Sequence, residues 1–146
     1  MTHIWKKEFQ IEDLNRFREA SIVGHLDIKF LEKGENFLSA TMPVDKRTVQ
    51  PMGILHGGAS VVLAETLGSA ASYMTLDDSC YSVGLEVKAN HLKSISNGSV
   101  TGTARPVHLG RTTQVWDICV ENEKNELICV SRLTMAVLKI SPGPGS

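Results

Sequence analysis

The chain has little cysteine, and the way its cysteines are placed excludes two common uses. The 146 residues contain three of them, Cys80, Cys119 and Cys129, and neither their number nor their spacing fits a disulfide framework or a zinc site. A reduced, cytoplasmic setting is therefore expected. We interpret the cysteines as small buried hydrophobic residues, with the alternative that Cys119 and Cys129 face each other across a hairpin.

An excess of one charge and a long hydrophobic run are also missing. The formal net charge is -1, whereas nucleic-acid-binding domains are typically strongly basic. The N-terminus lacks the apolar core of a signal peptide, and the longest apolar stretch is too short and too interrupted to span a bilayer. We therefore expect neither a nucleic-acid partner nor a membrane association.

Several common catalytic motifs are absent as well. Without a G-x-S-x-G elbow, a serine hydrolase of the usual kind is not supported. Without an H-E-x-x-H motif or a Cys/His cluster, metal-assisted hydrolysis has no support, and no metal is expected. Neither a Walker nor a dinucleotide-binding glycine pattern occurs, so we expect no bound cofactor.

The length and the composition are those of an ordinary globular domain. Hydrophobic residues make up 42% of the chain and charged residues 21%. This length suits one domain with a single core, which we place at residues 1–140. Residues 141–146 contain only Ser, Pro and Gly, and are expected to be a flexible tail or an expression remnant.

Hydrophobic periodicity predicts an α+β fold with one long helix. Tight turns between successive strands imply an antiparallel sheet. A single apolar helix needs a sheet to bury it, so the sheet should curve around the helix. The expected elements are a short amphipathic helix in residues 10–20 (Ile11, Leu14 and Phe17), a hairpin of strands at 28–31 and 37–44, a long helix at about 59–74, and strands within 80–93, 98–110, 111–122 and 127–140.

One carboxylate interrupts the long apolar helix. At helical spacing Glu65 shares a side with Val61, Val62 and Gly68 rather than with other charged residues. Burying an ionised carboxylate there is costly unless something compensates for it. Glu65 is therefore expected to be held by structural hydrogen bonds, to lie at a subunit interface, or to have a catalytic function.

A glycine pair, Gly57-Gly58, lies where this helix begins. The first N–H groups of a helix have no internal partner, and they carry the positive end of the helix dipole. They can stabilise a carbonyl oxygen that gains negative charge during attack. A glycine pair alone can be an ordinary tight turn. Together with Glu65 two turns later, however, it supplies the polarising group and the nucleophile or base that acyl transfer requires.

The segment "MPVDKRTVQPMGILHGGASVVLAETLGS" resembles the hotdog-fold acyl-CoA thioesterases of the PaaI type. The segments "VGLEVKANHLK", "GTARPVHLGRTTQVW" and "VSRLTMAVL" are similar to the same family, and the resemblance extends from about Trp5 to Leu138. It is greatest to the bacterial branch with 1,4-dihydroxy-2-naphthoyl-CoA hydrolases of menaquinone biosynthesis and proofreading thioesterases of enterobactin synthesis. The resemblance implies a hotdog fold, hydrolysis of an acyl-CoA (aromatic acyl groups above all), and a homodimer with the active site at its interface. Dimers of this family often pair into a homotetramer.

The resemblance also implies roles for individual residues. Glu65 matches the catalytic carboxylate, acting as nucleophile or as general base for water. Gly58 would supply the backbone N–H that polarises the thioester carbonyl. His56 and Gln50 match side chains that orient or polarise this carbonyl, and Ser69 matches a polar position that holds the water or the carboxylate.

Coenzyme A carries several phosphates, so its binding requires a positive rim. The "HLGR" turn is the best candidate because a guanidinium suits phosphate oxygens. The alternative for this turn is an ordinary solvated turn. Gly84 could border the pantetheine arm, and the alternative for it is a simple strand bulge. The candidate coenzyme A-binding residues are Val83, Gly84, His91, Lys93, His108, Leu109, Gly110 and Arg111.

Other functions are compatible with the same fold, which by itself does not assign one. A hydratase is less favoured because no Asp-His pair occurs at a suitable spacing. A non-catalytic acyl-CoA-binding protein remains an alternative, against which the presence of Glu65 argues. The sequence does not identify the acyl group.

Overall fold

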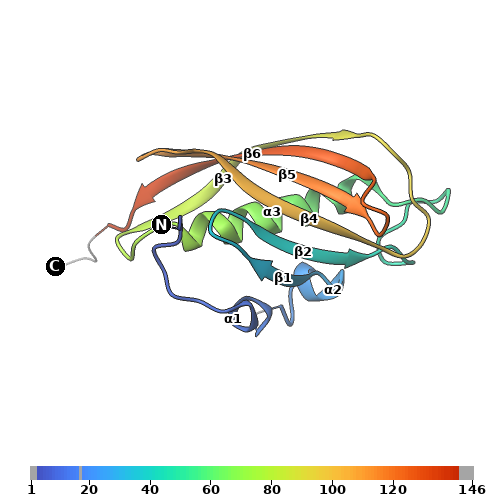
Figure 1. The fold of residues 1–146 in the computed structure, drawn as a ribbon, viewed down its shortest axis with the longest axis horizontal. Coiled ribbons are helices and arrows are strands. Elements are labelled where there is room, and N and C mark those ends of the chain that lie inside the picture. The colour runs from blue at the N-terminus through green and yellow to red at the C-terminus, as the bar shows by residue number, and fades with distance from the viewer. Residues whose placement is uncertain (1–2, 17, 142–146) are drawn as a thin grey trace.

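The computed structural model describes residues 3–16 and 18–141. Within them, six strands form one antiparallel sheet in the order β1-β2-β4-β5-β6-β3, and the helix α3 lies along one face of it (Figure 1). The predicted α+β fold, an antiparallel sheet around one long helix, is confirmed. The elements are α1 (Ile11–Arg16), α2 (Ile22–His25), β1 (Lys29–Lys33), β2 (Leu38–Pro43), α3 (Gly57–Met74), β3 (Cys80–His91), β4 (Ser99–Leu109), β5 (Thr113–Asn122) and β6 (Leu127–Lys139).

Helix α3 is held by an apolar stripe that faces the sheet. Leu63, Leu67 and Ala71 recur at four-residue spacing and are completely buried. Burial of each leucine side chain contributes about 1.5–3 kcal/mol. On β4, a Cβ at Gly102 would lie 2.8 Å from Leu67 Cδ1, so the glycine lets the helix approach the strand closely.

Successive side chains of β5 point alternately to the inner and the outer face of the sheet. Trp116 and Ile118 point into the core and are completely buried, whereas Cys119 is exposed. Cys119 pairs with Val130, and the buried Cys129 pairs with Val120, so the two thiols lie on opposite faces of the sheet. The alternative that they face each other is therefore wrong, because neighbouring strand positions point in opposite directions.

A buried polar chain joins the sheet to the last turn of α3. Trp116 Nε1 donates to Gln114 Oε1 at 2.9 Å, and Gln114 Nε2 donates to Thr75 Oγ1 at 2.9 Å. Thr75 Oγ1 in turn donates to the Ser72 carbonyl at 2.7 Å. Each of these buried groups therefore has a partner, which is the condition under which polar groups are tolerated in a core.

Strand β3 forms one edge of the sheet and pairs, in the part of the chain that the structure describes, with β6 alone. The pairing skips Leu85 between Gly84 and Glu86, which makes Leu85 an extra residue in a β-bulge. Val83 is 42% and Leu85 63% exposed. A long edge strand with exposed hydrophobic side chains is a ready surface for pairing with another strand.

The ends of the chain are described only in part. The first helix, α1, is shorter than predicted, and Phe17, which we assigned to it, lies outside the described residues. The expected tail at 141–146 also lies outside them, except for Ser141. No helix within the described ranges has both the length and the apolar character needed to cross a membrane.

Candidate active site

An open cavity of about 390 Å³ lies at the beginning of α3. Gln50, His91 and Lys93, which the sequence analysis assigned to catalysis or coenzyme A binding, line it together with Gly57. The cavity therefore brings together residues from the loop before α3, from α3 itself and from the end of β3. Its other lining residues are Ile54, Leu55, Ser60, Leu92, Ser94 and Ile128.

A tight turn fixes the orientation of Gln50. The Gln50 carbonyl accepts a hydrogen bond from Gly53 N–H at 2.8 Å, and Gln50 Oε1 accepts one from Met52 N–H. Gly53 has φ 83°, a left-handed conformation that glycine adopts without strain. Because the turn uses Oε1, the Nε2 amide of Gln50 is the part of the side chain best placed to donate to a ligand.

His56 caps the N-terminus of α3. Its Nδ1 accepts a hydrogen bond from Gly58 N–H at 2.8 Å. A Cβ at Gly58 would lie 2.9 Å from Nδ1, so the ring has room in this place only next to a glycine. The Gly58 N–H that we expected to polarise a thioester carbonyl is thus occupied by a side chain of the same protein.

Gly57 lies against a second imidazole. A Cβ at Gly57 would come within 2.8 Å of His91 Nε2, so the His91 ring on β3 packs directly on the beginning of the helix. Among the described residues, no acceptor bonds the Gly57 N–H, unlike that of Gly58. Gly57 therefore carries the N–H group of this turn that remains for a ligand.

Glu65 lies two turns farther along α3, about 12 Å from Gly57 along the helix axis. Its side chain is exposed, not buried as the helical pattern suggested, because this side of α3 faces the open edge of the sheet rather than its inner surface. A Cβ at Gly84 would lie 3.5 Å from Glu65 Oε2, so the carboxylate lies over β3 next to the bulge at Leu85. Among the described residues, no hydrogen bond or ion pair engages the carboxylate.

Polar groups continue from Glu65 toward the end of the helix. Ser69, one turn beyond, is half-buried. Ser72, a further turn away, is buried and donates to Ser82 Oγ on β3 at 2.8 Å. The helix and the edge strand thus enclose a polar strip that begins at the catalytic candidate.

The candidate coenzyme A-binding residues fall into two groups at opposite ends of the sheet. His91 pairs with Cys129 near the beginning of β6, and Lys93 contacts the Glu126 carboxylate. That contact, together with Asn122, holds the pKa of Glu126 below its usual range. The second group begins with Val83 and Gly84, which pair with Ala136 and Met135 near the other end of β6. It also contains the turn at residues 108–111, which consists of the last two residues of β4, His108 and Leu109, and of Gly110 and Arg111 before β5.

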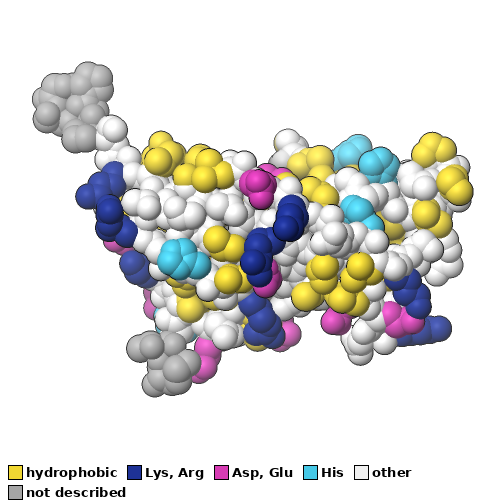
Figure 2. All heavy atoms as spheres, turned by 90° about the horizontal axis from the view of Figure 1, so that it is seen from above, with side chains coloured by type: hydrophobic (Ala, Val, Ile, Leu, Met, Phe, Trp, Pro, Cys, Tyr) yellow, Lys and Arg dark blue, Asp and Glu magenta, His cyan; other side chains and the backbone are white. Residues whose placement is uncertain are grey.

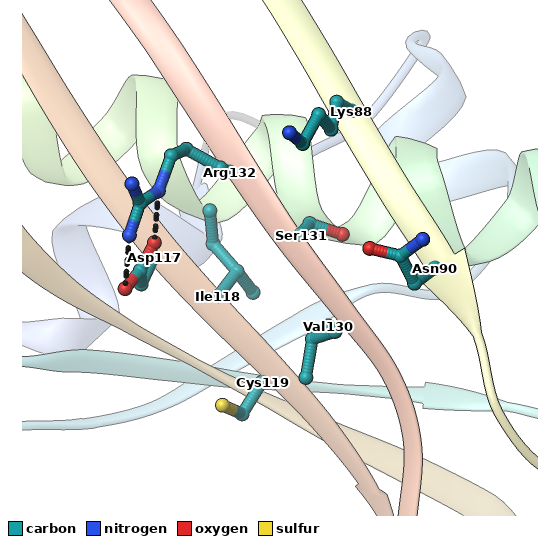
Figure 3. Close-up of a pocket in the computed structure, with 8 residues that line it drawn as sticks. All are labelled: Lys88, Asn90, Asp117, Ile118, Cys119, Val130, Ser131 and Arg132. Carbon is teal, nitrogen blue, oxygen red and sulfur yellow. Dashed lines mark hydrogen bonds and ion pairs between the residues drawn. The ribbon is translucent and has the colours of Figure 1, made fainter.

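A further cavity, of about 250 Å³, opens on the outer face of the sheet (Figure 3). Arg132 and Asp117 form a two-pronged ion pair in it, at 2.7 and 3.1 Å. Seen from this side, basic, acidic and hydrophobic side chains are interspersed, and none of them dominates the face (Figure 2). The cavity contains none of the predicted site residues, and its principal charges neutralise each other.

Comparison with known proteins places this architecture in a family. Residues 52–129 match the thioesterase superfamily. The chain is 52% identical to the 1,4-dihydroxy-2-naphthoyl-CoA hydrolase of Escherichia coli, over 92% of this chain and 99% of the relative. It is 47% identical to the proofreading thioesterase EntH of Cronobacter turicensis, over 92% and 98% of the two chains. The crystal structure of a thioesterase from Haemophilus influenzae superimposes with a TM-score of 0.93 at 48% identity, covering 97% of this chain and 99% of the other.

These relatives agree with the features built up above. The hotdog fold expected from the sequence is confirmed, and so is the enzyme class, a thioester hydrolase. With a sheet wrapped around α3, glycines at the first turn and a carboxylate two turns later, the chain belongs to the thioesterase superfamily.

Proposed function

We propose that this thioesterase hydrolyses an acyl-CoA to the free acid and coenzyme A, at a site shared by two copies of the chain. The names of two relatives, a 1,4-dihydroxy-2-naphthoyl-CoA hydrolase and a proofreading thioesterase, favour an aromatic acyl group such as 1,4-dihydroxy-2-naphthoyl. The observation that supports a site shared between two chains is that the predicted residues form two separate groups within one chain.

One group supplies hydrogen-bond donors and the other supplies the carboxylate. The donor group lies at the beginning of α3, where Gln50, Gly57 and His91 line the cavity. The carboxylate group contains Glu65 and Ser69, about 12 Å away along the helix. A thioester carbonyl cannot contact both groups of one chain, since reacting atoms must approach to about 3–3.5 Å.

A two-fold axis at the open edge of β3 brings the two groups together. Antiparallel pairing of two β3 strands, centred between Val87 and Lys88, sets Gly84 of one chain opposite His91 of the other. Because Gly84 lies beside Glu65 and His91 beside Gly57, each carboxylate then meets the helix start of the other chain. The exposed hydrophobic residues of β3 favour this homodimer. Pairing of two dimers into a homotetramer remains a prediction.

The chemistry follows from the shared site. The thioester carbonyl accepts a hydrogen bond from Gly57 N–H, which we favour over Gly58 N–H because the latter is already bonded. Glu65 of the partner subunit attacks the carbonyl carbon, or removes a proton from a water molecule that attacks it. In either case the carbon–sulfur bond breaks and coenzyme A leaves as a thiolate that takes up a proton. Attack by Glu65 leaves a mixed anhydride, which water hydrolyses to the acid and the free carboxylate, whereas attack by water gives the acid directly. His56 and Gln50 orient the carbonyl, and Ser69 holds the water or the carboxylate.

The same symmetry unites the residues proposed to bind coenzyme A. His91 and Lys93 of one chain come to lie near Val83 and Gly84 of the other. The turn of residues 108–111 belongs to this end of the partner sheet, and its arginine adds a fork suited to phosphate oxygens. A positive rim for the nucleotide therefore requires both subunits.

The first test measures hydrolysis of benzoyl-CoA, 1,4-dihydroxy-2-naphthoyl-CoA and decanoyl-CoA with a thiol reagent. Glu65→Gln is expected to lower kcat by at least 10³-fold, the order found when a principal catalytic group is removed. Glu12→Gln, which changes a surface carboxylate of α1, is the matched control and retains the wild-type rate. Equal, negligible hydrolysis by wild type and Glu65→Gln, with retained binding, would instead establish a non-catalytic acyl-CoA-binding protein.

A second test addresses the shared site directly. One chain carries Glu65→Gln, and the other carries Gln50→Ala with His56→Ala, each with a different affinity tag. Each homodimer is expected to be inactive, whereas the purified heterodimer recovers about half of the wild-type rate because one of its two sites is intact. A heterodimer as inactive as its parents would place the whole site within one chain.

A further inference from the structure

We infer that His56 works as a neutral imidazole of one fixed tautomer, with its hydrogen on Nε2, and that Gly58 is the positioning residue that fixes it. The inference deepens the proposed function, because it assigns the Nε2–H group of His56 to the thioester carbonyl. It also gives the two neighbouring glycines different tasks. Gly57 offers its N–H to the substrate, and Gly58 offers its N–H to a side chain.

The hydrogen bond at the helix start determines where the ring proton lies. A backbone N–H can only donate, so His56 Nδ1, 2.8 Å from Gly58 N, must be the acceptor and carry no hydrogen. In a neutral imidazole the hydrogen then resides on Nε2. A charged imidazolium would present a second donor to the Gly58 N–H and could not form this bond.

Among the described residues, the side chain of His56 makes one hydrogen bond, the one that Nδ1 accepts from Gly58 N–H. The beginning of α3 carries the positive end of the helix dipole, and His56 is the residue that caps it. A second imidazole, that of His91 on β3, packs on the adjacent Gly57. The nearest ammonium group on the cavity wall, that of Lys93, is engaged by Glu126. A hydrogen on Nδ1 would therefore have no acceptor among the described residues.

The consequence for the reaction is a pair of donors of different kinds. Gly57 N–H belongs to the backbone of the helix, whereas His56 Nε2–H belongs to an exposed side chain that the Gly58 bond orients. Donors that are oriented before the substrate binds need no reorganisation as negative charge develops on the carbonyl oxygen. Gly58 thus acts through His56 and does not itself touch the substrate.

The direct test is the tautomeric state of His56 in the free enzyme. Long-range proton–nitrogen correlation spectra of protein with ¹⁵N-labelled histidine distinguish a protonated from an unprotonated ring nitrogen, and His56→Gln identifies the signals. We expect a protonated Nε2 and an unprotonated Nδ1. The exposed His25 of α2 is the internal control, for which a mixture of tautomers is expected. A mixture at His56 like that of His25, or an imidazolium, would overturn the inference.

Two substitutions of His56 separate its capping bond to Gly58 from the hydrogen-bond donor at Nε2. Asparagine places an oxygen near the position of Nδ1, so His56→Asn keeps the bond to Gly58 but has no group near Nε2. Glutamine places an amide near Nε2 and loses the cap. We expect His56→Asn to retain the melting temperature and to lose about 10²-fold in kcat with little change in KM. His56→Gln is expected to melt at a lower temperature and to keep more of kcat.

Wild-type kcat in His56→Asn would show that Nε2–H has no part in the reaction. The spectra do not depend on turnover, which keeps this inference separable from the proposed function. If the wild type hydrolyses no acyl-CoA while His56 shows the fixed tautomer, the proposed function fails and the assignment of the ring proton stands.

Discussion

At the first turn of α3, an added methyl group at either of two positions would meet an imidazole. The distances are 2.8 Å from a Cβ at Gly57 to His91 Nε2 and 2.9 Å from one at Gly58 to His56 Nδ1. Both glycines lie in a helix, where alanine is intrinsically better by about 1 kcal/mol. The two glycines therefore lower the helix propensity at these positions, and they leave room for the imidazoles of His91 and His56.

Gly57→Ala is expected to separate activity from stability. The new methyl group displaces the His91 ring from the helix start, and a shift of about 1 Å in a site costs on the order of 10²-fold in kcat/KM. The free energy of unfolding should stay equal or rise slightly, because alanine favours the helix. Steady-state kinetics and urea denaturation measure the two effects, with Ala70→Gly as the control that lowers stability without touching the site. Wild-type kinetics would contradict the role of His91 packing.

Asp45 introduces the loop that carries Gln50, and its ionisation is coupled to folding. Its hydrogen bond with the Arg47 side chain, at 2.5 Å, and that with Arg47 N–H lower the pKa of Asp45 from 3.8 to about 2. Because the pKa is lower in the folded state, this contribution to stability is complete above pH 3.8 and disappears as the pH falls toward 2. NMR titration should show a carboxyl transition near 2, which Arg47→Ala moves back toward 3.8.

Among the elements, α3 and the central strands follow from the sequence most directly. The four-residue spacing of Leu63, Leu67 and Ala71 and the alternation along β5 depend on local geometry alone, so periodicity identifies them. The exposure of Glu65 could not be predicted in this way. The helical wheel identifies the side of the helix that Glu65 occupies, but whether that side is covered depends on where the sheet ends.

The hydrogen bond between Gly58 and His56, and the division of the coenzyme A candidates into two groups, could not be predicted from the sequence for a similar reason. The bond from Gly58 N–H to His56 depends on a side-chain rotamer, which composition and spacing do not encode. The distance between the turn at 108–111 and His91 depends on strand order. That order places β3 at the edge beside β6, although β4 follows β3 in the sequence.

The buried chain from Trp116 to Thr75 predicts a clear stability difference between two substitutions. Thr75→Val removes the hydroxyl that accepts from Gln114, which leaves a buried amide without a partner and costs about 1–3 kcal/mol. Thr75→Ser keeps the hydroxyl and should cost less, because it removes a methyl group alone. Urea denaturation of both variants measures the difference. Equal losses would show that packing, and not the hydrogen bond, dominates at this position.

At the scale of the whole molecule, a site divided between two chains makes activity depend on association. The single chain presents its donors and its carboxylate at separate places along α3, and β3 offers an open edge for pairing. If the site is shared as proposed, a monomer has no complete active site, and activity is linked to protein concentration by mass action.

Dilution is therefore expected to lower the activity per milligram of enzyme, with a midpoint equal to that of dimer dissociation. Mass photometry gives the fraction of dimer over the same concentration range. Leu85→Lys, which puts a charge on the exposed bulge of β3, should move both midpoints to higher concentration together. Leu31→Lys, at an exposed position on β1, serves as the control. Constant specific activity through the dissociation range would argue for a site complete in one chain.

The contacts between the two glycines and the two imidazoles also restrict how this enzyme can evolve. A side chain can appear at position 57 only where the residue at position 91 becomes smaller or moves away, and position 58 is tied to position 56 in the same manner. The four positions should therefore change as two coupled pairs among homologous sequences. A lineage that exchanged one member of a pair would pass through a poorly active intermediate, which makes the arrangement hard to leave by single mutations.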